Sequence, residues 1–241
     1  MEKMQPHPDT PGTNVQLRPE AAPKWLRPIL DVSADDIVGV LGERIFVNAK
    51  PYRNSAAVLV AFTGTNVDDA CVLLTHRSPH LRSHSGQIAF PGGRVDPPDL
   101  NMVDTALRES WEETGLDRDE IIPLKDIGTV PIPFRGIEVN VVLAYWPQPG
   151  QVGVINVEEA DDVFIYPVAK LLALENQLTV AIDEWQGKAF RCNDYIIWGF
   201  TAAVLVAIFH TAGWIKKWET GPVVKLSTVL ASSSNNERLA H

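Results

Sequence analysis

Apolar and polar residues alternate along this chain in a pattern that predicts a mixed α/β fold. Four short runs rich in Val, Ile, Leu and aromatic residues are typical of β-strands, at 55–62, 71–75, 139–145 and 163–168. A polar cluster, GTNVDD, separates the first two runs, so these strands are expected to form a hairpin within a mixed sheet. Ser33, followed by Asp36 and an apolar stretch, predicts a short capped helix that ends at Gly42.

A longer helix is predicted at about 102–114, because Gly115 stands where a left-handed residue would end it. At roughly 100° per residue, one face gathers the carboxylates of Glu109, Glu112 and Glu113. The opposite face carries Val103, Leu107, Trp111 and Thr114. Like charges three or four residues apart cost about 0.2–0.5 kcal/mol per pair. Taken alone, the pattern fits either a solvated acidic face or a set of oxygen ligands for Mg²⁺ or Mn²⁺.

The apolar segment 195–215 contains no Asp, Glu, Lys or Arg, and its length alone would suit a transmembrane helix. Small and polar residues interrupt it, however, and His210 would be costly in lipid. Lys216 and Lys217 fit either a membrane flank or the C-terminus of a helix in a globular domain. We therefore expect one buried core helix and no membrane partner.

The composition is that of an ordinary folded protein, with 241 residues, 45% of them hydrophobic and 21% charged. The length favours one domain, which we assign to 24–228 between a Pro-rich tail at 1–23 and a polar tail at 229–241, both expected to be disordered. The first tail lacks the apolar core of a secretory signal, and two cysteines cannot form a disulfide framework, so a cytoplasmic location is expected. A net charge of -9 argues against a nucleic-acid partner. The oligomeric state stays open.

A local basic segment contrasts with this negative charge. Residues 76–94 contain no acidic residue and carry His76, Arg77, His80, Arg82, His84 and Arg94. The segment includes the turn Phe90-Pro91-Gly92-Gly93, whose glycines permit close approach of the backbone to a ligand. The guanidinium groups of Arg77 and Arg82 suit phosphate oxygens. Zinc binding by the three histidines is disfavoured, because Pro79 interrupts the helix that their spacing would need.

The glycine turn and the carboxylate helix together resemble the Nudix box of the Nudix hydrolase superfamily. The matching residues are Gly93, Arg108, Glu109, Glu112, Glu113, Gly115 and Leu116. Two positions depart from the box. Asp99 occupies the first glutamate position, one residue too far from Arg108, and Ser110 replaces an aliphatic residue. The Arg-Glu-x-x-Glu-Glu core is intact, which favours an active enzyme.

Residues 73–93, LLTHRSPHLRSHSGQIAFPGG, resemble the second motif of the coenzyme A diphosphatase branch, LLTxRSxxxRxxxGxxxFPGG, at every specified position. The resemblance extends over about 55–214. It implies a Nudix-type α/β/α sandwich with a mixed central sheet and a loop-helix-loop catalytic motif.

The resemblance also implies roles for individual residues. Glu109, Glu112 and Glu113 would bind Mg²⁺ or Mn²⁺, Arg108 would orient them, and Gly92 and Gly93 would face the metal or the diphosphate. Arg77 and Arg82 would bind substrate, including the 3'-phosphate of coenzyme A. Glu159 would add a distal carboxylate to the metal site, with Glu158 as its competitor.

The implied activity is hydrolysis of coenzyme A or acyl-CoA to 3',5'-ADP and 4'-phosphopantetheine or its acyl form. The partner would thus be a small nucleotide. An ADP-ribose or dinucleotide diphosphatase and a non-catalytic Nudix domain that senses a nucleotide are the alternatives. Loss of box glutamates would favour the sensor, and the sequence retains all three.

Overall fold

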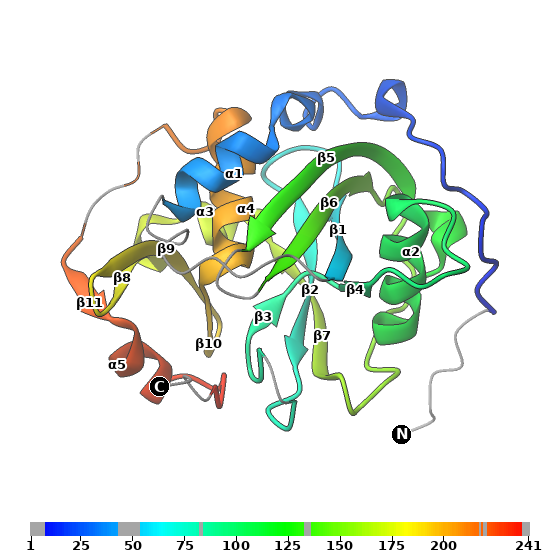
Figure 1. Cartoon of the computed structure of the whole chain (residues 1–241). Helices are drawn as coiled ribbons and strands as arrows, with labels where there is room; N and C mark the ends of the chain where they lie inside the picture. The colour runs from blue at the N-terminus through cyan, green and yellow to red at the C-terminus, as the bar shows by residue number, and fades with distance from the viewer. Residues whose placement is uncertain are drawn as a thin grey trace.

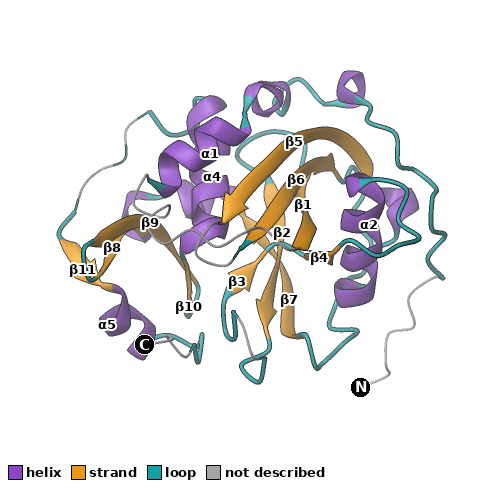
Figure 2. Cartoon of the chain, viewed as in Figure 1, coloured by secondary structure: helices purple, strands orange, loops and turns teal. Residues whose placement is uncertain are grey.

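The computed structural model describes residues 8–42, 54–81, 84–132, 136–216, 218 and 221–237 (Figures 1 and 2). The α-helices are α1 (Ala34–Leu41), α2 (Met102–Thr114), α3 (Val168–Leu172), α4 (Gly199–Thr211) and α5 (Leu226–Ala231). Short 3-10 helices are η1 (Pro19–Ala21), η2 (Arg27–Asp31), η4 (Arg118–Glu120) and η5 (Leu174–Asn176). The strands are β1 (Asn54–Thr63), β2 (Cys71–Arg77), β3 (Ile88–Ala89), β4 (Gly92–Arg94), β5 (Ile122–Ile132), β6 (Ile137–Tyr145), β7 (Ala160–Pro167), β8 (Gln177–Ile182), β9 (Trp185–Cys192), β10 (Tyr195–Ile197) and β11 (Val223–Lys225).

A mixed seven-stranded sheet lies at the centre of the molecule (Figure 1). Its strand order is β3-β2-β1-β6-β5, with β4 also paired to β1 and β7 to β2. Strands β1 and β6 run parallel, whereas the other pairs in this sheet are antiparallel. Phe62 of β1 lies opposite Val72 of β2, as in the predicted hairpin. The mixed sheet is therefore confirmed.

The two faces of this sheet bury two separate apolar cores, because successive side chains of a strand point to opposite faces. Along β1, Val60 and Phe62 belong to the core that includes residues of α1 and α4. Leu59 and Ala61 belong to the core that includes residues of α2. Helices thus cover both faces, as Figure 2 shows, and the predicted α/β/α layering is confirmed.

Helix α1 begins and ends where its sequence signals predict. Ser33 accepts a hydrogen bond from Asp36 N (3.2 Å), and the Asp36 carboxylate accepts one from Ser33 N (2.8 Å), which completes a capping box. Gly42, with φ of 84°, follows the last turn. Ile37 and Leu41 are fully or nearly fully buried against the sheet core, so the helix fixes one outer layer.

The single helix predicted for 195–215 is two elements. Tyr195–Ile197 forms β10, and Gly199, with φ of 63°, turns the chain into α4. Nine residues of α4, 201–209, are buried, so the predicted core position is confirmed and the predicted extent is wrong. Among the described residues, no helix has both the length and the apolar character needed to cross a membrane.

A second sheet, absent from the sequence predictions, lies beside the first at the left of Figure 1. Its strand order is β10-β9-β8-β11. With α5 it encloses a small core of Val180, Ala189, Ile196, Leu226, Val229 and Leu230. The strands are short and carry Gly187 and several charged residues, which weakens the alternating pattern that would have indicated them.

The described parts of both predicted tails, 8–23 and 229–237, pack on the domain. Near the N-terminus, Asp9 pairs with Arg118 (2.6 Å) and Arg18 N donates to Pro123 O (2.8 Å), so 8–23 is not the disordered segment that its prolines predict. Near the C-terminus, α5 extends past 229 and Asn235 is fully buried. Polar contacts make part of this packing, and the buried Ala22, Val229 and Leu230 make the apolar part. Residues 1–7 and 238–241 lie outside the described part.

Candidate active site

Helix α2 has the bounds that its start and stop signals predict. Asn101 caps its N-terminus by accepting a hydrogen bond from Asp104 N (3.0 Å). Gly115 ends it with φ of 71° and donates its N–H to Trp111 O (2.8 Å). These caps fix the position of every carboxylate on the helix.

The buried face of α2 differs from the prediction at Glu113, which was predicted on the open face and is almost fully buried, and at Trp111. Val103, Ala106 and Leu107 pack in the core beneath the helix, but Trp111 is only half-buried. Ser110 takes the fully buried position, and its hydroxyl donates to Ala106 O (2.6 Å). At roughly 100° per residue, position 110 points almost in the direction of Val103, whereas position 111 points about 80° away from it. The small Ser110 therefore faces the core, and its hydroxyl is hydrogen-bonded there.

The glycine turn lies directly against the carboxylates of α2. Gly92 N donates to Glu113 Oε2 (3.1 Å). Gly92 has φ of 154°, and a Cβ there would collide with the backbone of Ala57 and Val58. A Cβ at Gly93 would occupy the space of the Glu109 carboxylate. Both glycines are therefore needed for this close approach.

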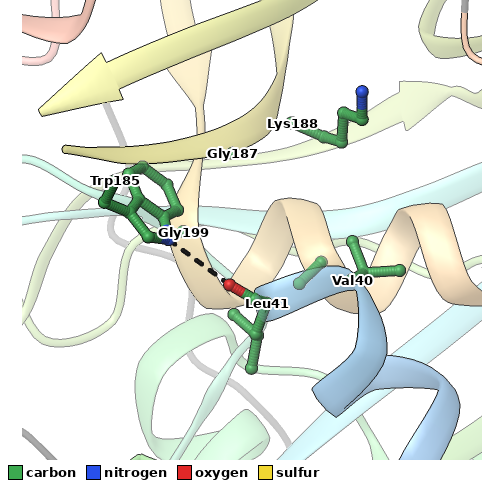
Figure 3. Close-up of a pocket in the computed structure, with 7 residues that line it drawn as sticks. Val40, Leu41, Trp185, Gly187, Lys188 and Gly199 are labelled. Carbon is green, nitrogen blue, oxygen red and sulfur yellow. Dashed lines mark hydrogen bonds between the residues drawn. The ribbon is translucent and has the colours of Figure 1, made fainter. Parts of the chain in front are cut away.

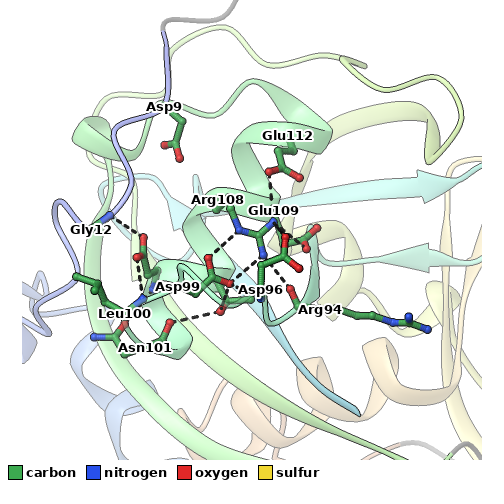
Figure 4. Close-up of polar contacts among 12 residues, drawn as sticks. Asp9, Gly12, Arg94, Asp96, Asp99, Leu100, Asn101, Arg108, Glu109 and Glu112 are labelled. Atoms are coloured by element: carbon green, nitrogen blue, oxygen red, sulfur yellow. Dashed lines mark hydrogen bonds and ion pairs between the residues drawn. The ribbon is translucent and has the colours of Figure 1, made fainter. Parts of the chain in front are cut away.

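Arg108 ties the helix carboxylates to the glycine turn (Figure 4). Its Nη2 donates to Arg94 O (2.8 Å), and its Nη1 lies 3.1 Å from Glu109 and 3.3 Å from Glu112. Asp99 receives Nε (2.8 Å) and Nη2 (2.9 Å) in a bidentate pair, which lowers the pKa of Asp99 to about 2. The sequence indicated Asp99 only as a departure from the box. Although its side chain is shorter than that of glutamate and it lies one residue further from Arg108, its carboxylate still pairs with the arginine.

Glu109 and Glu113 are carboxylates with too few donors for their burial. Burial raises the pKa of Glu113 to about 8, against the charge of Arg77 and the Gly92 N–H. Burial likewise raises the pKa of Glu109 to about 7, although Arg108 opposes the shift. Glu112 differs, because its side chain is 43% exposed. The first two glutamates thus form a site that favours added positive charge.

Glu159, and not its neighbour Glu158, faces these glutamates. The charge of Glu159 contributes to the raised pKa values of both Glu109 and Glu113. Glu159 is half-buried and its carbonyl accepts from Ser78 N (2.9 Å), whereas Glu158 is exposed. The loop before β7 therefore brings one distal carboxylate toward α2.

Arg77, the last residue of β2, reaches the same site. Its Nη1 lies 3.6 Å from Glu113 Oε1. Its Nε is buried and makes no hydrogen bond among the described residues, which leaves a donor for a bound group. Arg82, the second predicted substrate arginine, lies outside the described residues.

His76 and His80 of the basic segment lie in different surroundings. His76 is buried in β2, where it contacts Asp161 and lies 3.0 Å from Asn235 O, while His80 is exposed in the following loop. Across the described ranges, no group of three His, Cys, Asp or Glu side chains is already gathered as a metal cage. The buried Glu109 and Glu113 nevertheless fit a hard divalent cation, since burial raises both pKa values in spite of Arg108 and Arg77, and both carboxylates lie against the closely approaching glycine turn.

A separate pocket lies on the other side of the main sheet, between α1, β9 and α4 (Figure 3). Trp185 Nε1 donates to Leu41 O (3.3 Å) at its edge, and Gly199 and Ala203 form part of its wall. The glutamates of α2 do not line it. It is therefore no part of the carboxylate site.

Comparison with known proteins gives the same region a family. The NUDIX domain matches residues 51–185, which include the glycine turn, α2, Arg77 and Glu159. "Nudix hydrolase 15, mitochondrial" of Arabidopsis thaliana is 34% identical over 170 residues, 65% of this chain and 57% of that protein. "Uncharacterized Nudix hydrolase NudL" of Photorhabdus laumondii is 33% identical over 139 residues, 56% of this chain and 73% of that protein.

Among solved structures, a MutT/nudix family protein from Enterococcus faecalis is 19% identical and gives a TM-score of 0.46, covering 70% of this chain and 65% of that chain. The chain spans little more than half the length of the plant relative. The NUDIX match, by contrast, covers more than half of the chain itself and contains the whole carboxylate site. The chain belongs to the Nudix domain family.

Proposed function

We propose that this protein is a metal-dependent diphosphatase that hydrolyses coenzyme A or acyl-CoA to 3',5'-ADP and 4'-phosphopantetheine or its acyl form. One observation carries the diphosphatase part of the proposal: Arg77 lies 3.6 Å from Glu113 of the box. The coenzyme A part rests on the resemblance of residues 73–93, which include Arg77, to the motif of the coenzyme A diphosphatase branch. Arg77 and Glu113, one residue of each motif and more than thirty positions apart along the chain, thus meet at one site. A cationic donor beside buried carboxylates suits a diphosphate held through a divalent ion.

Glu109, Glu112 and Glu113 are the proposed ligands of Mg²⁺ or Mn²⁺, with Glu159 as a further carboxylate. The ion supplies charge neutralisation of the diphosphate and activation of water. Arg108 keeps Glu109 and Glu112 oriented through the contacts described above, so it acts by positioning.

Arg77 is the proposed contact of this chain with the diphosphate oxygens, through Nη1 and through the Nε that makes no hydrogen bond within the described part of the chain. The backbone at Gly92 and Gly93 lets the substrate approach the glutamates. Because every box glutamate is present, catalysis is favoured over nucleotide sensing. The cytoplasmic location stays a prediction from composition.

The diphosphate is common to coenzyme A and ADP-ribose, so the position of Arg77 beside Glu113 does not distinguish them. Discrimination requires a contact with the 3'-phosphate, and Arg82 is the proposed donor. We expect Arg82→Ala to lower kcat/KM for coenzyme A about tenfold more than for 3'-dephospho-coenzyme A, since a charged hydrogen bond contributes about 1.5–3 kcal/mol. Arg77→Ala should lower both values equally.

The test is kcat/KM of the wild type on coenzyme A, its dephospho form, ADP-ribose and NADH, with Mg²⁺ or Mn²⁺ and with identification of the products. Coenzyme A should be preferred, with 3',5'-ADP released. Preference for ADP-ribose would reject the coenzyme A assignment while leaving the diphosphatase intact. Lack of turnover of every diphosphate would reject the enzyme.

A further inference from the structure

The C-terminal segment 232–237 lies against the loop between β2 and β3, which follows Arg77 directly. This segment is about fifty residues beyond the end of the NUDIX match at 185. Two parts of the chain that are about 150 residues apart therefore meet beside the proposed substrate site.

Asn235 is the centre of this contact and is fully buried. Its Nδ2 donates to Gly86 O (2.9 Å) and to Ile196 O (3.1 Å), and its Oδ1 accepts from Ile196 N (2.7 Å). Ser233 Oγ donates to the same Oδ1 (2.9 Å). The amide thus uses both its donors and its acceptor to join the β2–β3 loop to β10.

Gly86 carries this contact to Arg77. Gly86 N donates to Arg77 O (2.9 Å), and Arg77 N donates to Gln87 O (2.9 Å). Gly86 has φ of 74°, and a Cβ there would collide with Asn235 O, so the loop and the segment are in direct backbone contact. Two hydrogen bonds therefore separate the Asn235 side chain from the main chain of the arginine that faces Glu113.

Two further contacts hold the same segment. His76 Nε2, one residue before Arg77, lies 3.0 Å from Asn235 O. The Glu237 carboxylate accepts from Gln87 Nε2 and, at 2.8 Å, from Trp198 Nε1. The segment thus contacts β2, the end of the loop and the start of α4.

We infer that Asn235 is a positioning residue for substrate binding: it fixes the β2–β3 loop and thereby the position of Arg77 at the carboxylate site. This inference rests on the proposed function. The glutamates themselves are held separately, by Arg108 and the glycine turn. Release of the loop should therefore weaken substrate binding more than the chemical step.

The test compares Asn235→Asp with Asn236→Asp. The first change replaces the donor to Gly86 O and Ile196 O by a carboxylate oxygen that repels both. The second makes the same chemical change at an exposed neighbour, whose Nδ2 donates only to Ser234 O (3.3 Å) in the described structure. Kinetics are measured on coenzyme A and on ADP-ribose, and hydrogen exchange is followed along the whole chain.

Asn235→Asp should raise KM about tenfold with kcat changed less than about threefold, as for residues that orient a site from outside it. Exchange should accelerate at 77–87 and 195–197 but not in α2. Asn236→Asp should match the wild type. Unchanged KM, or faster exchange that is equal throughout the chain, would overturn the inference.

If Asn235→Asp does not fold, Glu237→Ala provides the decision, because it removes the contacts with Gln87 and Trp198 and keeps the Asn235 side chain. Glu237→Ala should raise KM about threefold, less than Asn235→Asp, because it loosens the loop less. An unchanged KM would reject the inference. Failure of the wild type on coenzyme A with turnover of ADP-ribose would count against the proposed substrate alone, since the effect on KM is then read from ADP-ribose.

Discussion

Two carboxylates on helix α2 are almost equally buried, and they behave in opposite ways. Asp104 is 1% exposed and Glu113 is 2% exposed. Asp104 accepts hydrogen bonds from Gly12 N (3.1 Å), Leu100 N (3.1 Å) and Arg118 Nη1 (2.8 Å). Burial raises its pKa, but these donors outweigh burial and the net shift is downward. Glu113 receives one backbone N–H and a guanidinium at 3.6 Å, and its pKa rises to about 8.

The difference shows that burial alone does not distinguish a structural carboxylate from a functional one. Asp104 is saturated with donors, so it joins the N-terminal segment to α2 and needs no ligand. Glu113 lies nine residues along the same helix and has an incomplete set of partners, which a divalent ion would complete. The opposite pKa shifts therefore reflect both the number of donors around each carboxylate and the greater depth of Glu113 in the protein.

The largest effect is expected from Asp104→Asn, which removes the charge of the buried carboxylate that has a full set of hydrogen-bond donors. It should lower the free energy of unfolding by about 3 kcal/mol, at the low end for a broken buried ion pair because Asp9 still pairs with Arg118. Denaturant unfolding of the variant measures this loss. Asp119→Asn, an exposed change in the adjacent η4, is the control and should be neutral. Equal stability of the two variants would mean that the buried pair contributes little.

Glu113→Gln tests the buried carboxylate whose set of partners is incomplete. It should reduce kcat by at least about 100-fold, because changes in the shell around a metal ligand already cost about 10–100-fold. Its stability without metal should match or exceed that of the wild type, since the free-energy cost of the raised pKa of Glu113 is removed. Activity assays and unfolding in a chelator measure both effects. Near wild-type turnover with saturating Mg²⁺ would make the ligand assignment wrong.

A smaller loss distinguishes the two distal glutamates. Glu159→Gln should lower kcat about tenfold, because its charge acts on Glu109 and Glu113. Glu158→Gln is the matched change at the exposed neighbour and should leave kcat unaltered. A greater loss at Glu158 would transfer the role to that residue.

The smallest effect is a dependence of stability on pH. The folded protein holds a proton on Glu113 up to pH about 8, whereas the unfolded carboxyl titrates near 4.5, so stability falls as the pH rises through this window. In a chelator, the Tm should fall by at least about 3 °C between pH 5 and pH 8, and by less in Glu113→Gln. Asp104 acts oppositely, because its lowered pKa costs stability only as the pH falls below about 3.8. Calorimetry that finds the same slope in Glu113→Gln would contradict this account.

The sequence predicted those helices and strands whose start, end or apolar pattern is set by residues within or next to them. The bounds of α1 and α2 follow from Ser33, Gly42 and Gly115. The predicted strands were recognised from continuous runs of apolar residues alone. Strand β5 was missed because Pro123 and Gly128 interrupt its pattern at two irregularities of register. The alternation there is real but broken, so periodicity could not detect it.

The site was predictable where spacing along one helix decides it and not where packing does. The carboxylate pattern indicated Glu109 and Glu113, but it gave Trp111 the buried position that Ser110 holds. Contacts such as those of Asp9 with Arg118, or of Asn235 with Gly86, join residues more than a hundred positions apart. No local pattern encodes such pairs, so polar composition could not indicate the contacts that 8–23 and 229–237 make with the domain.

The buried helix α4 also bears on how the chain is made. It has no polar face, so in isolation it would expose apolar surface on every side to water. Its partners η2, α1 and β9 all precede it in the sequence, as do the strands whose core it joins. During synthesis, these docking surfaces therefore leave the ribosome before α4 does. The order of elements shortens the time in which the apolar surface of α4 is exposed to water.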